Sequence, residues 1–508
     1  MPRTRRPLAV PLAAATALLL AACQPVPDAA QTTDRDGIRR GSIVFKPCTL
    51  EGAGSFGNVE ARCATFEVPE NPAAPDGRRI SLDIGWLPAG NDDDAIADPV
   101  FFIAGGPGQS ATGVASFVDK ALSEVGKQRD IFLVDQRGTG GSNPLTCEDA
   151  DGKPLPIDET AQPTPELLAE YAGRCAASLE GRADPRFYTT TEAIADLDAV
   201  RAALGAEQIN LIGASYGTRV AQQYARTYAA HTRSLVLDGV APNDLVVGGE
   251  FATTFEDAIA LQSAQCRKDA ACAKRFPTDT RSQLQTLMTR LRAAPVEVEY
   301  RDPGTGAIEH GTLSADTVVS LAFAFSYVPE LTALLPLTLD EAAQGRYAPL
   351  MSLAGLSSRQ MGDQMNRGMQ WSVICAEDAD RYTAPATSDS LLGNDVANMF
   401  FAACKVWPKG TRPADFTVPF TSDKPVLLLS GQYDPVTPAR YAERVVKGLP
   451  NGRSVVARGQ GHGTLMAGCM PRLVGQFIER ADAKSLDTSC LDTLSDVPAF
   501  TSFNGWQP

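Results

Sequence analysis

The sequence predicts an α/β fold in which a mostly parallel central sheet, flanked by helices, is interrupted by a large, mainly helical insertion. Continuous apolar runs at 100–103 and 131–134 end in glycine-rich turns, and helical patterns alternate with such runs. Parallel strands are buried on both faces and therefore read as unbroken apolar stretches. The alternation stops near residue 243 and resumes near 423, which predicts the insertion.

The first part of the core is expected at 41–242. The alternating runs at 64–69 and 78–88 favour half-exposed strands, before the two buried strands already mentioned. Apolar residues at helical spacing then precede Gly205 in "TTTEAIADLDAVRAALG", which indicates a helix that this glycine ends. A strand at 209–213, a helix near 216–229 and a strand at 234–240 complete a βαβ series.

Residues 243–422 are expected to form a helical cap inserted after the sixth main strand. Their pattern is mostly helical, as in "TFEDAIALQSAQC", with one hairpin near 296–313. The core resumes at 423–508 with the strand "PVLLLS", the helix "ARYAERVVKGLP", the strand "RSVVARG" and a helix near 471–480. The two core parts are expected to share one sheet, because sequential α/β units pack side by side.

The N-terminus reads as a targeting segment. In residues 1–22, arginines precede an apolar stretch that is too short to span a bilayer, as in a signal peptide. The ending "LAAC" resembles the lipobox of bacterial lipoproteins, in which the cysteine becomes the lipidated first residue. Cys23 is therefore the expected anchor, with 23–40 as its flexible tether, and an ordinary secretory signal is the alternative. The resemblance implies a lipid-anchored protein of the bacterial cell envelope, periplasmic or at the outer membrane, or an extracellular one.

The cysteines support export. Of eleven cysteines, ten remain when Cys23 is set aside, and an even number suits disulfides in an oxidising compartment. A bridge between Cys266 and Cys272 requires a helix break near Asp269, because a continuous helix would separate them by about 9 Å. No C-x-x-C motif occurs and there are three histidines, so no metal site is expected. Pairing neighbours in sequence order predicts Cys48–Cys63, Cys147–Cys175, Cys266–Cys272, Cys375–Cys404 and Cys469–Cys490.

A candidate nucleophile lies in "GASYG", residues 213–217. This G-x-S-x-G pentapeptide joins a buried strand directly to a helix. In that setting a tight elbow lifts the serine hydroxyl above the sheet edge, while glycines allow close backbone approach. The alternative is a non-catalytic serine whose hydroxyl is hydrogen-bonded within an ordinary turn. We expect Ser215 to be the nucleophile.

A serine nucleophile needs a base and an acid that orients it. His462 follows a late strand, whereas His231 precedes a strand at the opposite end of the sheet and His310 lies in the hairpin. Asp434 lies just beyond the strand at 425–430, where a carboxylate would fix the imidazole tautomer and stabilise the imidazolium. Asp423 precedes that strand, at the wrong end. The expected order of serine, aspartate and histidine follows.

The tetrahedral intermediate also needs N–H donors for its oxyanion. The backbone N–H of Tyr216, directly after the serine, is one expected donor. The other should come from "GGPG" at 105–108, which follows the third main strand. Gly106 is the expected residue and Gly105 is the alternative.

The motifs "AGGPGQSA", "DQRGTGGSNP", "GASYGTR", "GQYDPVTP" and "GQGHGT" occur in this order. Together they resemble the tripeptidyl aminopeptidase and proline iminopeptidase branch of the α/β-hydrolase fold, over about residues 45–480. Many proline iminopeptidases have histidine where this chain has Ala104, so narrow proline specificity is not implied. The resemblance implies removal of residues from free N-termini, with acidic cap residues holding the substrate ammonium. The candidates are Glu250, Glu256, Glu377 and Asp378; a solvated surface charge is the alternative for each.

The sequence thus predicts an exported serine exopeptidase. It would release short N-terminal peptides, or single residues such as proline, through an acyl-enzyme intermediate and without a cofactor. Its expected partners are peptides with a free N-terminus, and its only expected membrane attachment is the N-terminal lipid. The formal net charge of −14 disfavours nucleic acid. A carboxylesterase or lipase with the same triad is the alternative, since fold does not decide the substrate, and a non-catalytic lipoprotein is a third.

Overall fold

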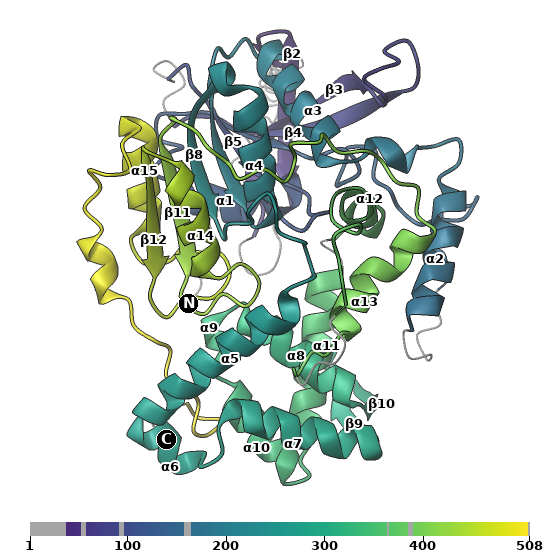
Figure 1. Cartoon of the computed structure of the whole chain (residues 1–508), viewed down its shortest axis with the longest axis vertical. Coiled ribbons are helices and arrows are strands. Elements are labelled where there is room, and N and C mark those ends of the chain that lie inside the picture. Colours follow the sequence, from purple (N-terminus) through teal and green to yellow (C-terminus); the bar gives the residue numbers. More distant parts are fainter. Residues whose placement is uncertain are drawn as a thin grey trace, which may run out of the picture.

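A ten-stranded sheet forms the centre of the molecule in the computed structural model (Figure 1), with strand order β1-β2-β3-β4-β6-β5-β7-β8-β11-β12. The structure describes residues 37–51, 57–90, 96–156, 164–362, 365–384 and 390–505. The predicted signal peptide and Cys23 lie outside these residues. The strands are β1 (Ile38–Arg40), β2 (Ile43–Leu50), β3 (Val59–Pro69), β4 (Arg79–Leu87), β5 (Val100–Ile103), β6 (Ile131–Val134), β7 (Ile209–Ala214), β8 (Thr232–Asp238), β11 (Val426–Gly431) and β12 (Gly452–Ala457).

The sheet has an antiparallel and a parallel part. Strands β1 to β4 pair antiparallel, and β4 also pairs antiparallel with β6. From β6 onward every neighbouring pair is parallel, through β5, β7, β8, β11 and β12. All four residues of β5 and of β6 are buried, as their unbroken apolar runs predict. The predicted fold class, a mostly parallel sheet flanked by helices, is confirmed.

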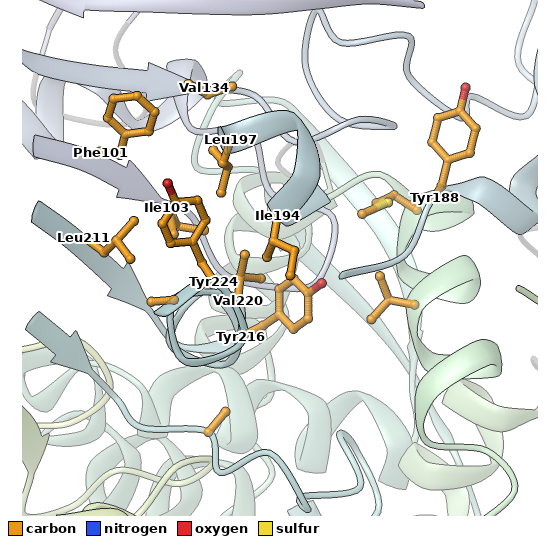
Figure 2. Close-up of a cluster of buried hydrophobic side chains, with 14 of the residues drawn as sticks. Phe101, Ile103, Val134, Tyr188, Ile194, Leu197, Leu211, Tyr216, Val220 and Tyr224 are labelled. Atoms are coloured by element: carbon orange, nitrogen blue, oxygen red, sulfur yellow. The ribbon is translucent and has the colours of Figure 1, made fainter. Parts of the chain in front are cut away.

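Helices cover both faces of the sheet, and the strands alternate between the two cores. Phe101 and Ile103 pack in one core, and Val100 and Phe102 in the other. Residues of α3 (Thr190–Ala203), α4 (Tyr216–Thr227) and α14 (Ala439–Val445) join the first core, whereas those of α1 (Ala115–Ala121) and α15 (Met470–Arg480) join the second. Figure 2 shows the first core, in which Tyr216 and Val220 of α4 lie beside Ile194 of α3.

After β8 the chain leaves the sheet and builds a helical body below it in Figure 1. This body has its own apolar core, which includes Phe255, Leu284, Leu321 and Leu339. The predicted hairpin is the separate two-stranded sheet of β9 and β10. The elements are α5 (Phe251–Lys268), α6 (Ala270–Arg275), α7 (Thr280–Ala293), β9 (Val296–Arg301), β10 (Ile308–Leu313), α8 (Ala315–Ser326), α9 (Pro329–Thr332), α10 (Leu335–Ala343) and α11 (Ala348–Gly362).

The last part of the expected cap packs differently. Trp371 in α12 (Arg367–Glu377), together with Trp407 and Phe420, joins the main core rather than the core of α5 to α11. This segment, with α13 (Asp395–Ala402), lies beside α2 (Pro165–Ser178) at the edge of the sheet domain in Figure 1. A helical pattern shows that a helix buries one face, but it does not show against which core, so the sequence predicted a single insertion.

Five disulfides link the same cysteine pairs that the sequence order suggests. Helix α5 ends at Lys268 and α6 begins at Ala270, so the chain breaks between Cys266 and Cys272, whose Cα atoms lie 5.3 Å apart. The Asp269 side chain caps α6 by accepting a hydrogen bond from the Cys272 N–H. None of the helices within the described ranges has both the length and the apolar character that a bilayer span requires.

Candidate active site

Ser215 lies on a sharp elbow between β7 and α4. Its backbone has φ 55° and ψ −123°, a conformation that residues other than glycine rarely adopt. The flanking glycines make the elbow possible. A Cβ on Gly213 would lie 2.4 Å from the carbonyl oxygen of Gly217, and a Cβ on Gly217 would lie 2.3 Å from that of Ile103. The G-x-S-x-G spacing therefore follows from the close contact of α4 with β7 and β5.

His462 and Asp434 are in contact at the carboxyl ends of β12 and β11. Nδ1 of His462 lies 2.8 Å from Oδ2 of Asp434, and the His462 side chain is 14% exposed. The buried Asp434 carboxylate also accepts hydrogen bonds from the N–H groups of Val436 (2.9 Å) and Thr437 (2.7 Å). Burial alone would raise the pKa of Asp434, but the nearby His462 and these hydrogen bonds hold it below its ordinary value.

The pKa of His462 shifts in the opposite direction. Burial acts to lower it, but the charge of Asp434 and the hydrogen bond to it outweigh burial, so the pKa of His462 lies above its ordinary value. The contact with Asp434 engages Nδ1. Nε2 is consequently the ring nitrogen that remains to exchange a proton with a nucleophile.

The turn after β8 brings the serine elbow and the histidine loop together. The N–H of Ser215 donates to the carbonyl oxygen of Asp238 over 2.8 Å. A Cβ on the next residue, Gly239, would lie 3.0 Å from Cε1 of His462. The structure thus places Ser215, Asp434 and His462 beyond the carboxyl ends of β7, β11 and β12. In the sheet, β8 lies between β7 and β11, and β12 is next to β11.

The glycine-rich loop after β5 borders the serine. A Cβ on Gly105 would lie 3.0 Å from Cβ of Ser215. The Gly105 N–H donates to Oε1 of Gln109 over 3.2 Å, so it already has an acceptor, which favours Gly106 as the donor from this loop. Gly106 has φ 107°, a region that favours glycine. Tyr216 begins α4, where backbone N–H groups have no partner within the helix.

The chain matches family models over most of its sheet domain. One, described as "alpha/beta hydrolase fold", matches residues 98–301, and another, described as "TAP-like protein", matches residues 389–490. The chain is a serine hydrolase of the α/β-hydrolase family. The hydrolase is 26% identical over 407 residues to "Serine protease Hip1" of Mycobacterium tuberculosis, covering 74% of this chain and 77% of the relative.

Two further similarities concern proteins named as an aminopeptidase and as an iminopeptidase. "Tripeptidyl aminopeptidase" of Streptomyces lividans is 30% identical over 190 residues, covering 35% of each chain. The solved proline iminopeptidase of Mycobacterium smegmatis is 17% identical, with a TM-score of 0.40, covering 82% of this chain and 98% of that one. The family models and the sequence relatives named as a serine protease and as a tripeptidyl aminopeptidase confirm the resemblance to the peptidase branch that the sequence motifs predicted.

Two of the four predicted amine-binding carboxylates, Glu377 and Asp378, are fully buried inside the hydrolase. The Asp378 carboxylate lies 3.0 Å from Nη1 of Arg219, and that of Glu377 lies 3.7 Å from it. Glu377 also accepts a hydrogen bond from the N–H of Thr190 over 2.7 Å. Thr190 in turn bonds to the hydroxyl of Tyr216 over 2.6 Å. Since both carboxylates already have a cation and have no exposed surface, the structure favours a role in positioning α4 over the predicted amine binding.

Burial dominates the electrostatics of this cluster. It raises the pKa of Glu377 to about 7, against the opposing charge of Arg219. The adjacent Asp378 carboxylate raises this pKa further, because two negative charges side by side repel each other.

The other two predicted carboxylates lie in the first turns of α5. Glu256 pairs with Arg281 at 2.7 Å and accepts the N–H of Leu391 at 2.7 Å, so it has its partners within the cap. Glu250 directly precedes α5 without making a side-chain capping bond, is exposed, and accepts a hydrogen bond from the hydroxyl of Tyr441. Across the ranges that the structure describes, no lysine or arginine pairs with Glu250. Of the four, Glu250 is therefore the carboxylate that remains open to an ammonium group.

A row of aromatic rings, which sequence reasoning missed, connects His462 with the start of α5. The Tyr327 ring lies 5.2 Å from that of His462, the Phe323 ring 5.5 Å from Tyr327, and the Phe251 ring 5.8 Å from Phe323. Phe323 and Tyr327 are four residues apart, which places them on one side of α8 and its end. That spacing was visible in "FAFSY", but nothing in the sequence placed α8 over the histidine.

Proposed function

We propose that this hydrolase is an exported serine exopeptidase that removes short segments from the N-termini of peptides. The observation that carries the proposal is the contact between His462 and Asp434 beside the strained elbow of Ser215. This contact orients the imidazole so that Nε2 is left for the serine hydroxyl. Relatives named as a serine protease and as a tripeptidyl aminopeptidase support a peptide as substrate.

The reaction proceeds in two halves. The Ser215 hydroxyl attacks the scissile carbonyl carbon and gives its proton to Nε2 of His462, and Asp434 stabilises the imidazolium. The backbone N–H groups of Gly106 and Tyr216 hold the oxyanion. The leaving amine takes the proton from His462, and an acyl-enzyme remains. Water then attacks the ester with His462 as the base, which releases the acid and restores the serine.

Glu250 supports the restriction to free N-termini. An α-amine has a pKa of about 8 and is mostly protonated at neutral pH, so an exposed carboxylate can bind it. The aromatic row of Phe251, Phe323 and Tyr327 leads from the residue next to Glu250 to His462. In the proposed complex the apolar side chains of the substrate lie along this row, and the distance from Glu250 to Ser215 limits the length of the released segment.

The decisive test compares a tripeptidyl arylamide with its N-acetylated form. We expect turnover of the free amine and nearly none of the blocked compound, and Ser215→Ala should abolish both turnover and labelling by a fluorophosphonate. Glu250→Gln should raise KM for the free amine at least tenfold, whereas the matched Glu256→Gln should not. Equal turnover of the free and blocked compounds would indicate an esterase or an endopeptidase instead.

We also propose that the hydrolase is exported and held at the bacterial envelope by a lipid on Cys23. The five disulfides support export, since such bonds persist in oxidising compartments. The expected result is incorporation of a fatty-acid analogue into the wild type and none into Cys23→Ser. Incorporation into both proteins would refute the anchor.

A further inference from the structure

Asp238 joins the two halves of the proposed catalytic machinery. It is the last residue of β8 and is 2% exposed. Its backbone carbonyl accepts the N–H of Ser215 over 2.8 Å. Its carboxylate accepts hydrogen bonds from the loop after His462: from the N–H and hydroxyl of Thr464 over 2.7 and 2.8 Å, and from the N–H of Leu465 over 3.1 Å.

These contacts suit an ionised carboxylate. All three donors are N–H or O–H groups, and the carboxylate only accepts. Burial raises the pKa of Asp238 above its ordinary value, although the three hydrogen bonds and the nearby His462 act to lower it. Within the described residues no arginine or lysine pairs with Asp238. Asp238 is thus a buried carboxylate whose neighbouring cation would be the imidazolium of His462.

Geometry alone does not require this charge. The side-chain carbonyl oxygen of an asparagine could accept hydrogen bonds from both N–H groups. Its NH₂ group could donate to the Thr464 hydroxyl, which would then act as acceptor instead of donor. An uncompensated carboxylate is costly to bury, whereas a neutral amide costs much less. The negative charge is useful only where positive charge develops, and His462 becomes positive in the transition state.

Three ionisable groups lie around His462 on different elements. Asp434 contacts Nδ1 from the loop after β11, and the Tyr327 ring packs against the imidazole from the end of α8. The Asp238 carboxylate, at the end of β8, bonds to Thr464, two residues after the histidine. Both carboxylates raise the pKa of His462, while burial lowers it. Asp238 acts through space, because its oxygen atoms are occupied by the residues that follow the histidine.

We propose that Asp238 is a positioning residue that fixes the His462 loop against the serine elbow and, as a second carboxylate, stabilises the imidazolium that forms during catalysis. The inference rests on the proposed roles of Ser215 and His462. It does not depend on peptide specificity, so it can be tested with a simple activated ester.

The central variant is Asp238→Asn, which keeps the shape and removes the charge. The assay follows kcat/KM for p-nitrophenyl acetate against pH, in which the acidic limb is the decrease in kcat/KM on the low-pH side. We expect this limb to move to lower pH by roughly 1 unit, because His462 then binds its proton less tightly. We expect kcat on the plateau to fall about tenfold, with KM unchanged. Asp238→Glu keeps the charge and should leave the position of the acidic limb unchanged while lowering kcat.

Thr464→Val is the matched control for position, since it removes one hydrogen bond to Asp238 without changing any charge. It should lower kcat severalfold at every pH and leave the acidic limb in place. An unshifted limb in Asp238→Asn would overturn the electrostatic role, and wild-type kcat in Thr464→Val would overturn the positioning role. If Asp238→Asn is not recovered folded, Asp238→Ser is the neutral replacement: a limb shifted to lower pH supports the electrostatic role, and an unshifted limb overturns it. Ester turnover that persists in Ser215→Ala would instead refute the proposed function.

Discussion

The substitution Gly217→Ala tests whether the serine elbow depends on its close backbone contact. The added Cβ would lie 2.3 Å from the carbonyl oxygen of Ile103 and 2.6 Å from that of Ala104. Both are backbone atoms, of β5 and of the residue that leads into the glycine-rich loop, so no side chain can rotate away. Either α4 or the loop must move by about 1 Å before the contact becomes an ordinary van der Waals one.

The expected cost has two parts. Overpacking of this kind destabilises a protein by about 1–3 kcal/mol. Since α4 carries the N–H of Tyr216 and the loop carries that of Gly106, the movement also separates the two proposed oxyanion donors. A displacement of about 1 Å in catalytic geometry costs roughly 100-fold in rate. We therefore expect kcat to fall about 100-fold while the protein remains folded at 25 °C.

The assay is steady-state hydrolysis of a p-nitrophenyl ester, with thermal unfolding and fluorophosphonate titration of the fraction of active sites. Gly173→Ala is the matched control. A Cβ at this position in α2 would meet Val406 at an ordinary 3.9 Å, so activity should remain at the wild-type level. A kcat for Gly217→Ala within threefold of the wild type would refute the reasoning, because the elbow would then tolerate the displacement.

The remaining predictions concern the dyad, one disulfide and the buried cluster. Asp434→Asn should lower kcat about 10⁴-fold, because the imidazole would lose its catalytic tautomer. In the wild type, the base must be neutral and the pKa of His462 is raised, so kcat/KM should begin to decrease at a pH above 6.5 as the solution is acidified. A midpoint of this decrease below pH 6.5 would contradict the raised pKa. Replacing both Cys266 and Cys272 by serine should lower the free energy of unfolding by about 2 kcal/mol and leave kcat unchanged, as thermal unfolding and ester assays would show. For Glu377, the folded protein retains a proton that the unfolded chain releases between its ordinary pKa of 4.5 and about 7, so the wild-type free energy of unfolding should decrease as pH rises through this window. Glu377→Gln should flatten that decrease in denaturant titrations, and an equally steep decrease would assign it to other groups.

The sequence predicted the sheet because its signals are local. Unbroken apolar runs and the G-x-S-x-G elbow each lie within a dozen residues, and the same holds for the helix break at Asp269. The position of His462 after a late strand placed it at the correct sheet edge. These features need only the rule that carboxyl ends of parallel strands share one edge.

The features that the sequence did not reveal depend on contacts between distant segments. Glu377 and Asp378 follow an apolar helix, a pattern that fits a site as well as a core, and only Arg219 on α4 decides between them. Asp238 reads as an ordinary strand end until its contacts with Thr464 and Leu465 are known. Such long-range pairs have no periodicity, so a single sequence carries no signal for them.

The cluster around Arg219 also determines how the cap can move. Arg219 donates to the carbonyl oxygen of Leu245, and the N–H of Val247 donates to Asp378 over 3.2 Å, just before the chain passes into α5. Asp378 itself ends α12, by which the chain has returned to the sheet domain. The connection from β8 into α5 is therefore held against the helix that begins with Tyr216 as far as Val247. A movement of the cap must consequently hinge beyond Val247, because displacing the segment before it would break hydrogen bonds to a buried ion pair, at a cost of about 1.5–3 kcal/mol each.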